Sequence, residues 1–164
     1  MPKTIKTINA ATIGVGFGAL HAKVFKEHKN TKLLYINDFN KKKKLIAKKL
    51  KTTFVNNVDF IFKDKTINLV SIASYDNYHF VHLLKSIKNN KNIFIEKPLC
   101  QNIAQLNKIK KLLKSTKIQL SSNFVLRYHP MFKKVKDLIE NKKIGKIYSI
   151  EGEYNYGRLE KLVK

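Results

Sequence analysis

The stretch INAATIGVGFGALHA, residues 8–22, decides the fold of this chain. It opens with a short apolar run, Ile8–Ile13, of the kind that forms a buried β-strand. Gly14 and Gly16 follow at once, and a helical pattern then runs from Ala19 to His28. The order strand, glycine turn and helix predicts the first unit of a parallel α/β sheet.

The glycines in this stretch match the G-x-G-x-x-A fingerprint of dinucleotide-binding domains, in the strand-to-helix context that the fingerprint requires. Gly14 permits the tight turn, Gly16 lets backbone approach a pyrophosphate, and Ala19 keeps the helix close to the sheet. We expect Phe17 and Gly18 to line the same site, where the helix N-terminus offers N–H groups to phosphate. A turn with a purely structural role is the alternative.

An acid follows the second predicted strand. Asp38 lies 22 residues after Gly16, where a carboxylate accepts hydrogen bonds from ribose hydroxyls and repels a 2′-phosphate. The pattern therefore favours NAD over NADP, although the nearby run Lys41–Lys44 leaves NADP possible. Alternatively, Asp38 only caps the helix that starts near Asn40.

Strands and helices are predicted to alternate along the first three quarters of the chain. Further strands are expected at Lys32–Ile36, Thr53–Val55, Asn68–Ala73, Asn92–Glu96 and Ile118–Phe124. Helices are expected at Lys41–Leu50, Val58–Phe62, Tyr78–Lys88 and along Ile103, Leu106, Ile109 and Leu113. This alternation predicts an α/β, Rossmann-type, doubly wound parallel sheet with helices on both faces, over residues 1–124.

Residues 125–164 are predicted to begin a second, α+β domain. Pro130 opens a helix that runs to about Asn141, and IGKIYSIEGEYNYG at 144–157 predicts a turn followed by one long strand. A long strand needs a partner. Because no further strand follows, we expect the second domain to be incomplete in this chain.

Composition limits the classes of function. The net charge is +23, but all except two of the 34 basic residues are lysines, whereas nucleic-acid readers favour arginine. We therefore expect a solvated lysine surface and no nucleic-acid partner, with a basic nucleic-acid binder as a rival class. No apolar run approaches the about 18 residues of a membrane span, and the N-terminus lacks a signal pattern. Cys100 is the single cysteine, so we expect a cytoplasmic protein with no metal site.

Three further motifs suggest a family. SIASYDNYH at 71–79, EKPL at 96–99 and NFVLRYHP at 123–130 join the glycine turn and Asp38 in order and spacing. With them the chain resembles the Gfo/Idh/MocA oxidoreductases, which include glucose–fructose oxidoreductase and inositol dehydrogenase. The resemblance covers essentially the whole chain, and EKP is its most specific motif.

The resemblance implies a role for each matching residue. Lys97 is implied as the catalytic residue, beside the nicotinamide, where it orients substrate and assists proton movement. Glu96 would contact the nicotinamide-side ribose, and Pro98 would follow a cis peptide bond. The remaining implied cofactor contacts are Ser74, Asp76, His79, Asn123 and Arg127, the last two at the junction with the substrate domain.

Topology supports this set independently, because ligands of open α/β sheets bind at the carboxyl ends of the strands. The ends of five of the predicted strands carry Gly14, Asp38, Ser74, Lys97 and Asn123. An exposed lysine at the sheet edge is the alternative for Lys97. We interpret His21 and His129 as structural or solvated and Cys100 as a small buried side chain.

The function implied is an NAD(P)-dependent oxidoreductase that transfers hydride between nicotinamide and a carbinol carbon of a sugar, cyclitol or sugar nucleotide. Two features depart from the family: Ser74-Tyr75 replaces a common Thr-Pro, and the second domain, with its usual catalytic histidine, has no counterpart here. We therefore expect weak nucleotide binding, little turnover, and homo-oligomers only in a full-length form. The alternatives are a non-catalytic dinucleotide-binding module or half of a split enzyme.

Overall fold

The computed structural model describes residues 7–155. Residues up to Phe124 form one compact unit and residues from Val125 form a second. The first unit holds all the strands among the described residues. It therefore carries the sheet edge to which the sequence assigns the site.

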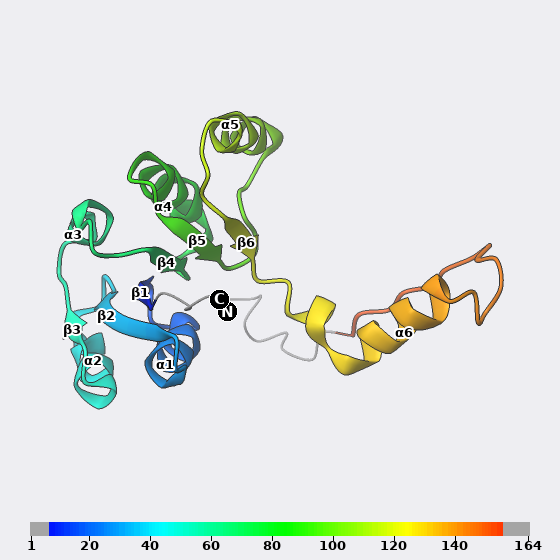
Figure 1. Ribbon diagram of the computed structural model, residues 1–164, viewed down its shortest axis with the longest axis horizontal. Helices are drawn as coiled ribbons and strands as arrows, with labels where there is room; N and C mark the ends of the chain where they lie inside the picture. The colour runs from blue at the N-terminus through cyan, green and yellow to red at the C-terminus, as the bar shows by residue number, and fades with distance from the viewer. Residues whose placement is uncertain (1–6, 156–164) are drawn as a thin grey trace, which may run out of the picture. The chain divides into compact units, whose positions relative to one another are not determined.

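A six-stranded parallel sheet forms the centre of the first unit (Figure 1). Its strands are β1 (Ile8–Ile13), β2 (Thr31–Asn37), β3 (Thr53–Phe54), β4 (Leu69–Ile72), β5 (Asn92–Ile95) and β6 (Leu120–Ser122). Their order across the sheet is β3-β2-β1-β4-β5-β6, and every neighbouring pair is parallel. This order reverses direction at β1 and β4, as in the doubly wound dinucleotide-binding fold. The predicted fold class is confirmed for this unit.

Helices cover both faces of the sheet, as predicted (Figure 1). On one face lie α1 (Gly18–Glu27) and α2 (Lys44–Leu50). On the other lie α3 (Asp59–Lys63), α4 (Asp76–Lys88) and α5 (Ile103–Lys114). Among the residues that the structure describes, no helix is long and apolar enough to span a membrane.

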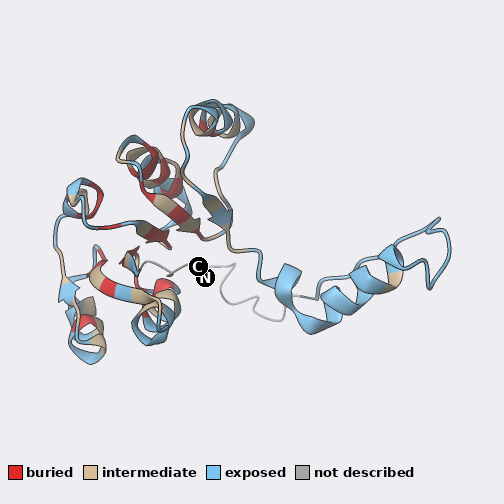
Figure 2. Cartoon of the chain, viewed as in Figure 1, coloured by how far each residue is buried: buried red, intermediate tan, exposed pale blue. Residues whose placement is uncertain are grey.

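Two hydrophobic clusters hold these layers together. The larger joins the inner sides of α3, α4 and α5 to the sheet, with Phe62, Leu83 and Ile109 fully or almost fully buried. The smaller joins α1 and α2 to the opposite face through Ala22, Ala47 and their neighbours. The buried residues in Figure 2 follow the strands and the inner sides of these helices. Packing of helices on both faces of the sheet therefore fixes the positions of the strand ends.

The helix predicted at Lys41–Leu50 is divided in the structure. Its first turn is a 3₁₀ segment, η1 (Lys41–Lys43), and α2 begins only at Lys44. The side chain of Asn40 accepts a hydrogen bond from the backbone N–H of Lys42, which tightens this turn. The division moves the start of α2 but leaves its apolar side on the sheet.

The second unit begins with a 3₁₀ turn, η2 (Val125–Tyr128), and continues as α6 (Pro130–Glu140). His129 caps α6 by accepting a hydrogen bond from the N–H of Met131. The predicted turn near residue 144 is present, with Gly145 at a φ of +70°.

The prediction of a long strand after this turn is wrong for the residues that the structure describes. Residues 146–155 adopt no strand, while Tyr156 and Gly157 lie outside the described range. The alternation of Tyr148, Ile150 and Gly152 with polar residues describes a possible sheet face, but a strand needs a hydrogen-bonded neighbour. No such neighbour lies within the described part of the second unit.

Candidate functional site

The predicted site residues gather at one edge of the sheet because all the strands run in the same direction. Gly14, Asp38, Ser74, Lys97 and Asn123 come one or two residues after the ends of β1, β2, β4, β5 and β6. This edge is the carboxyl end of the sheet, where open α/β folds bind ligands.

Gly14 makes the turn that leaves β1. Its φ is +80°, a left-handed conformation that favours glycine, and its N–H donates to the carbonyl oxygen of Asn37 at 2.8 Å. A Cβ at this position would lie only 2.4 Å from the carbonyl oxygen of Ala73. Both conformation and space therefore require glycine here.

Gly18, rather than Ala19, brings α1 close to the sheet. A Cβ on Gly18 would meet Cβ of Ala73 at 2.9 Å and Cγ2 of Thr12 at 3.0 Å. Ala19 is only half-buried, against the smaller cluster. The close approach predicted for the third fingerprint position thus occurs one residue earlier.

Gly16 faces open space, because a Cβ built on it would meet no heavy atom within 4 Å. The N-terminus of α1 next to it has no side-chain cap and no acid in its first turn. A helix N-terminus of this kind favours a negatively charged group. The turn therefore offers an open, anion-favouring backbone surface.

Asp38 is nearly buried and connects two parts of the edge. Its Oδ2 accepts a hydrogen bond from the N–H of Val15 and its Oδ1 one from the N–H of Asn40, each at 2.8 Å. The carboxylate thus stabilises the glycine turn as well as the turn before η1. The alternative prediction, that Asp38 only caps the following helix, does not account for its hydrogen bond with Val15.

A pocket of about 1030 Å³ opens in front of the turn. We call it the glycine-turn pocket; its walls include Gly14, Gly16, Phe17, Asp38, Phe39, Asn40, Lys43, Asn56, Asn57, Ser74, Tyr75, Asp76, Tyr78 and His82. Of the predicted cofactor contacts, Gly14, Gly16, Phe17, Asp38, Ser74 and Asp76 line it. Its size is in the range of small-molecule and cofactor sites.

Sequence reasoning missed most of these wall residues. Phe39 and Tyr75 directly follow Asp38 and Ser74, and their rings lie 5.5 Å apart between centroids. Lys43 comes from η1, and Asn56 and Asn57 come from the loop after β3. For Phe39, Tyr75, Asn56 and Asn57, a position just past a strand end was the available signal.

His79 lies beneath this pocket rather than on its wall. It is fully buried, its Nδ1 lies 2.7 Å from the carbonyl oxygen of Pro98, and its Nε2 lies 2.9 Å from that of Ser74. His82, one turn later on α4, lines the pocket instead and contacts Ser74 Oγ through Nδ1 at 3.0 Å. Burial, together with the charges of Lys85 and His79, lowers the pKa of His82 to about 4.

The EKP segment follows β5. The Lys97–Pro98 peptide bond is cis, as the resemblance implied, and the Lys97 side chain is exposed. Glu96 is half-buried and accepts a hydrogen bond from Asn123 Nδ2 at 2.7 Å. Neither Glu96 nor Lys97 belongs to the walls of the glycine-turn pocket. Arg127 lies in η2, in the second unit, and its cofactor contact stays a prediction.

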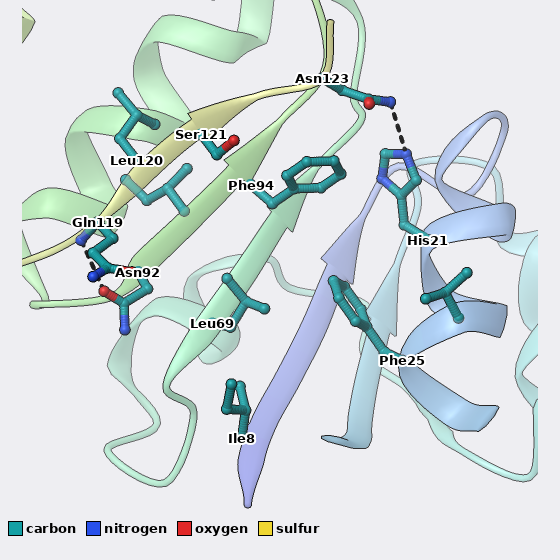
Figure 3. A pocket seen from close by; sticks show the side chains of 12 residues that line it. Ile8, His21, Phe25, Leu69, Asn92, Phe94, Gln119, Leu120, Ser121 and Asn123 are labelled. Carbon is teal, nitrogen blue, oxygen red and sulfur yellow. Dashed lines mark hydrogen bonds between the residues drawn. The ribbon is translucent and has the colours of Figure 1, made fainter. Parts of the chain in front are cut away.

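A second pocket, of about 860 Å³, lies on the sheet face that carries α1 (Figure 3). We call it the sheet-face pocket; its walls include Ile8, His21, Val24, Phe25, Leu69, Phe94, Leu120, Ser121 and Asn123. Figure 3 shows His21 and Asn123 pointing toward one another at one end, with Ile8 at the other. It is mostly apolar and shares no wall residue with the glycine-turn pocket.

The contacts of His21 were also not predicted from the sequence. Its Nε2 lies 3.2 Å from Glu96 Oε1, and its Nδ1 lies 2.8 Å from Ser71 Oγ. Burial lowers the pKa of His21, and the adjacent Glu96 carboxylate opposes this shift only in part. Within residues 7–155, no three His, Cys, Asp or Glu side chains are grouped to hold a metal ion.

Known proteins resemble this chain in sequence and fold. The model of an oxidoreductase family with an NAD-binding Rossmann fold, Gfo/Idh/MocA, matches residues 8–124. Myo-inositol 2-dehydrogenase of Thermotoga maritima is 31% identical over 86 residues, 52% of this chain and 26% of that protein. The 2,7-anhydro-N-acetylneuraminate hydratase of Escherichia coli is 26% identical over 149 residues, 90% of this chain and 40% of that protein.

A solved structure of an inositol dehydrogenase has a similar fold. Myo-inositol 2-dehydrogenase from Lactobacillus plantarum superimposes with a TM-score of 0.80 at 26% identity, covering 87% of this chain and 43% of that one. The chain thus spans less than half the length of these relatives. Because the family model matches most of the chain, including the glycine turn, Asp38 and the EKP segment, the chain belongs to the Gfo/Idh/MocA oxidoreductase family.

Proposed function

We propose that the glycine-turn pocket binds NAD(H), and that the protein oxidises or reduces a carbinol carbon of a sugar, cyclitol or sugar nucleotide. The observation that carries the proposal is the backbone surface at Gly16, open to solvent at an uncapped helix N-terminus and flanked by the Asp38 carboxylate. This combination accommodates a pyrophosphate and, beside it, a ribose.

Each wall of the pocket has a part in this proposal. The N–H groups at the start of α1 hold the phosphates, and Asp38 accepts hydrogen bonds from ribose hydroxyls. Phe39 and Tyr75, both exposed and paired, offer aromatic surface to a flat base. The carboxylate of Asp38 disfavours a 2′-phosphate, so we propose NAD rather than NADP, even though Lys43 also lies on the wall.

Chemistry on the substrate is assigned to the EKP segment. NAD supplies the site that accepts or donates hydride. The Nζ atom of Lys97 orients the substrate hydroxyl and exchanges its proton, while Glu96 contacts the ribose nearest the nicotinamide. The exposed position of Lys97 after β5 supports this assignment, because a substrate must be able to reach it.

The substrate class is proposed from the relatives, two of which are named as myo-inositol 2-dehydrogenases. Because another is named as a hydratase, an assay has to follow the redox state of the nicotinamide and not only the loss of substrate. Slow formation of NADH with myo-inositol, absent in Lys97→Met, is the expected result. Loss of substrate without any change in NAD would contradict the oxidoreductase proposal.

Binding is tested separately by thermal unfolding with millimolar NADH or NADPH. A ligand that binds only the folded chain must raise the midpoint. We expect a larger rise with NADH than with NADPH. No rise with either, in a chain that unfolds cooperatively, would contradict the proposal.

Two alternatives keep the binding site but change the role. In a non-catalytic dinucleotide-binding module, NADH raises the midpoint and no substrate is oxidised under any condition. In half of a split enzyme, oxidation appears when a separate chain carrying the second domain is added. The three roles therefore differ in activity and not in binding.

A further inference from the structure

The carboxylate of Glu96 is held by side chains from two other elements. His21, on the first turn of α1, approaches Oε1 through Nε2 at 3.2 Å, and Asn123, after β6, donates to the same oxygen at 2.7 Å. The other oxygen, Oε2, accepts from the backbone N–H of Lys97 at 3.3 Å. The carboxylate thus connects α1, β5 and β6 to the residue that bears the proposed catalytic amine.

The donors and acceptors in this group can be assigned. The Glu96 carboxylate accepts hydrogen bonds, so a His21 ring that donates to it carries its proton on Nε2. Burial lowers the pKa of His21, which favours the neutral ring. Nδ1 is then an acceptor, and the fully buried Ser71 hydroxyl, 2.8 Å away, donates to it.

Asn123 Nδ2 and His21 Nε2 lie 3.5 Å apart, a contact drawn as a dashed line in Figure 3. In this assignment both nitrogens are donors, so the contact contributes little by itself. It results from two donors pointing at one carboxylate oxygen. His21 and Asn123 are therefore alternative supports for the same atom.

The surroundings make His21 rigid. Its side chain is only 12% exposed, and its ring lies edge-on to Phe94 with centroids 5.1 Å apart. Backbone hydrogen bonds hold Glu96 only loosely, since its N–H donates to Ile72 and fixes the strand end, while the Lys97 N–H reaches Oε2 at a long 3.3 Å. Side-chain hydrogen bonds must supply the rest of the order.

We infer that His21 is a positioning residue, which holds the Glu96 carboxylate in place and through it orders the Lys97 backbone at the start of the EKP loop. The role in catalysis rests on the proposed function, but the ordering itself does not. Ser71 in turn fixes the ring of His21, so a chain of contacts leads from the middle of β4 to Lys97.

Variants at position 21 separate positioning from packing. His21→Gln keeps a side-chain N–H able to reach Glu96, whereas the shorter His21→Asn can reach only the Ser71 side. His28→Asn is a matched control at the exposed end of the same helix. If His21→Asn does not fold, Asn123→Ala removes the other donor to the same oxygen.

The readout without ligand is the NMR order parameter of the Glu96 and Lys97 backbone amides, about 0.85 for rigid backbone. We expect a fall of at least about 0.1 in His21→Asn or Asn123→Ala, and none in His21→Gln or His28→Asn. Equal values in all variants, or an equal fall in His21→Gln, would overturn the inference. An equal fall of the order parameters in His21→Gln would show that His21 has only a packing role.

NADH affinity tests the consequence for the proposed function. We expect His21→Asn to weaken NADH binding several-fold, and not to weaken it further in a Glu96→Gln background, because the two residues act as a unit. Multiplicative effects of the two changes would overturn the link to the cofactor. If the unsubstituted chain binds no NADH, the proposed function fails while the order parameters still decide the positioning role.

Discussion

The buried imidazole of His79 lies 2.7 Å from the carbonyl oxygen of Pro98 and, through its other nitrogen, contacts the loop after β4 as well. Pro98 directly follows Lys97, and the second partner is the carbonyl oxygen of Ser74. One side chain therefore connects the loop that lines the glycine-turn pocket to the loop that carries the proposed catalytic amine. It supports the spacing of the two loops that leave the neighbouring strands β4 and β5.

We predict that His79→Ala lowers the free energy of unfolding by about 1–3 kcal/mol, because it removes a fully buried ring whose one N–H donates to one of the two carbonyl oxygens beside it. Urea denaturation measures the loss. His82→Ala, on the same helix, serves as the comparison and should cost less, since His82 is only half-buried and contacts one hydroxyl. Equal losses at the two positions would show that His79 does not connect the loops.

Gly14→Ala should destabilise the fold by about 2–4 kcal/mol. Two costs add: alanine disfavours the left-handed conformation, and its Cβ would lie too close to Ala73. Gly16→Ala is the matched control, because its Cβ would meet no atom within 4 Å. It should leave denaturation nearly unchanged and instead weaken NADH binding. If both variants lose the same stability, the two glycines do not have the separate roles assigned here.

Asp38→Ala should reduce the preference for NADH over NADPH by about tenfold, since the carboxylate that repels a 2′-phosphate is removed. Titration calorimetry with each nucleotide gives the ratio of the two dissociation constants. Asp76→Asn neutralises another carboxylate on the same pocket wall and should leave this ratio within about twofold. An unchanged ratio in Asp38→Ala would remove Asp38 from cofactor selection.

Stability should fall as the pH is lowered from 6.5 to about 4. The pKa of His82 falls from 6.5 in the unfolded chain to about 4 in the folded one, and that of His21 is also lowered. Between these values the unfolded chain binds more protons, so protonation favours unfolding and the stability present at neutral pH is lost. For His82 the loss is on the order of 2 kcal/mol.

Denaturation midpoints of His82→Gln at several pH values check this prediction. The variant should show a flatter pH dependence between pH 4 and 6.5 than the unsubstituted chain. His28→Gln, at an exposed position, is the control and should keep the original slope. A slope that His82→Gln does not change would assign the acid sensitivity to other groups.

Much of the fold could be predicted because short apolar runs and glycine punctuation are local signals. Ile8–Ile13 was predicted with its observed bounds, and the alternation of strands with helices predicted that the strands are parallel. The strand expected at the end of the chain failed for a non-local reason. The alternation around Tyr148 describes a face, whereas a strand exists only beside a partner.

The site was predictable where residues directly follow a strand, as at Gly14, Asp38 and Ser74. It was not predictable where a helix decides which side chain turns inward. His79 and His82 lie three residues apart on α4, yet the first is fully buried and the second lines the pocket. The meeting of His21 with Glu96 depends on β1 and β5 ending at the same edge, which local spacing does not encode.

The most direct test of the central claim is a map of amide shifts in the NMR spectrum during titration with NADH. If the glycine-turn pocket binds the dinucleotide, the largest shifts occur at Gly14–Gly18, Asp38 and Ser74–Asp76, and Gly16→Ala reduces them. Shifts that spread over the lysine-rich surface and disappear with added salt would indicate non-specific binding. That result, or no shift at all in the folded chain, would contradict the account.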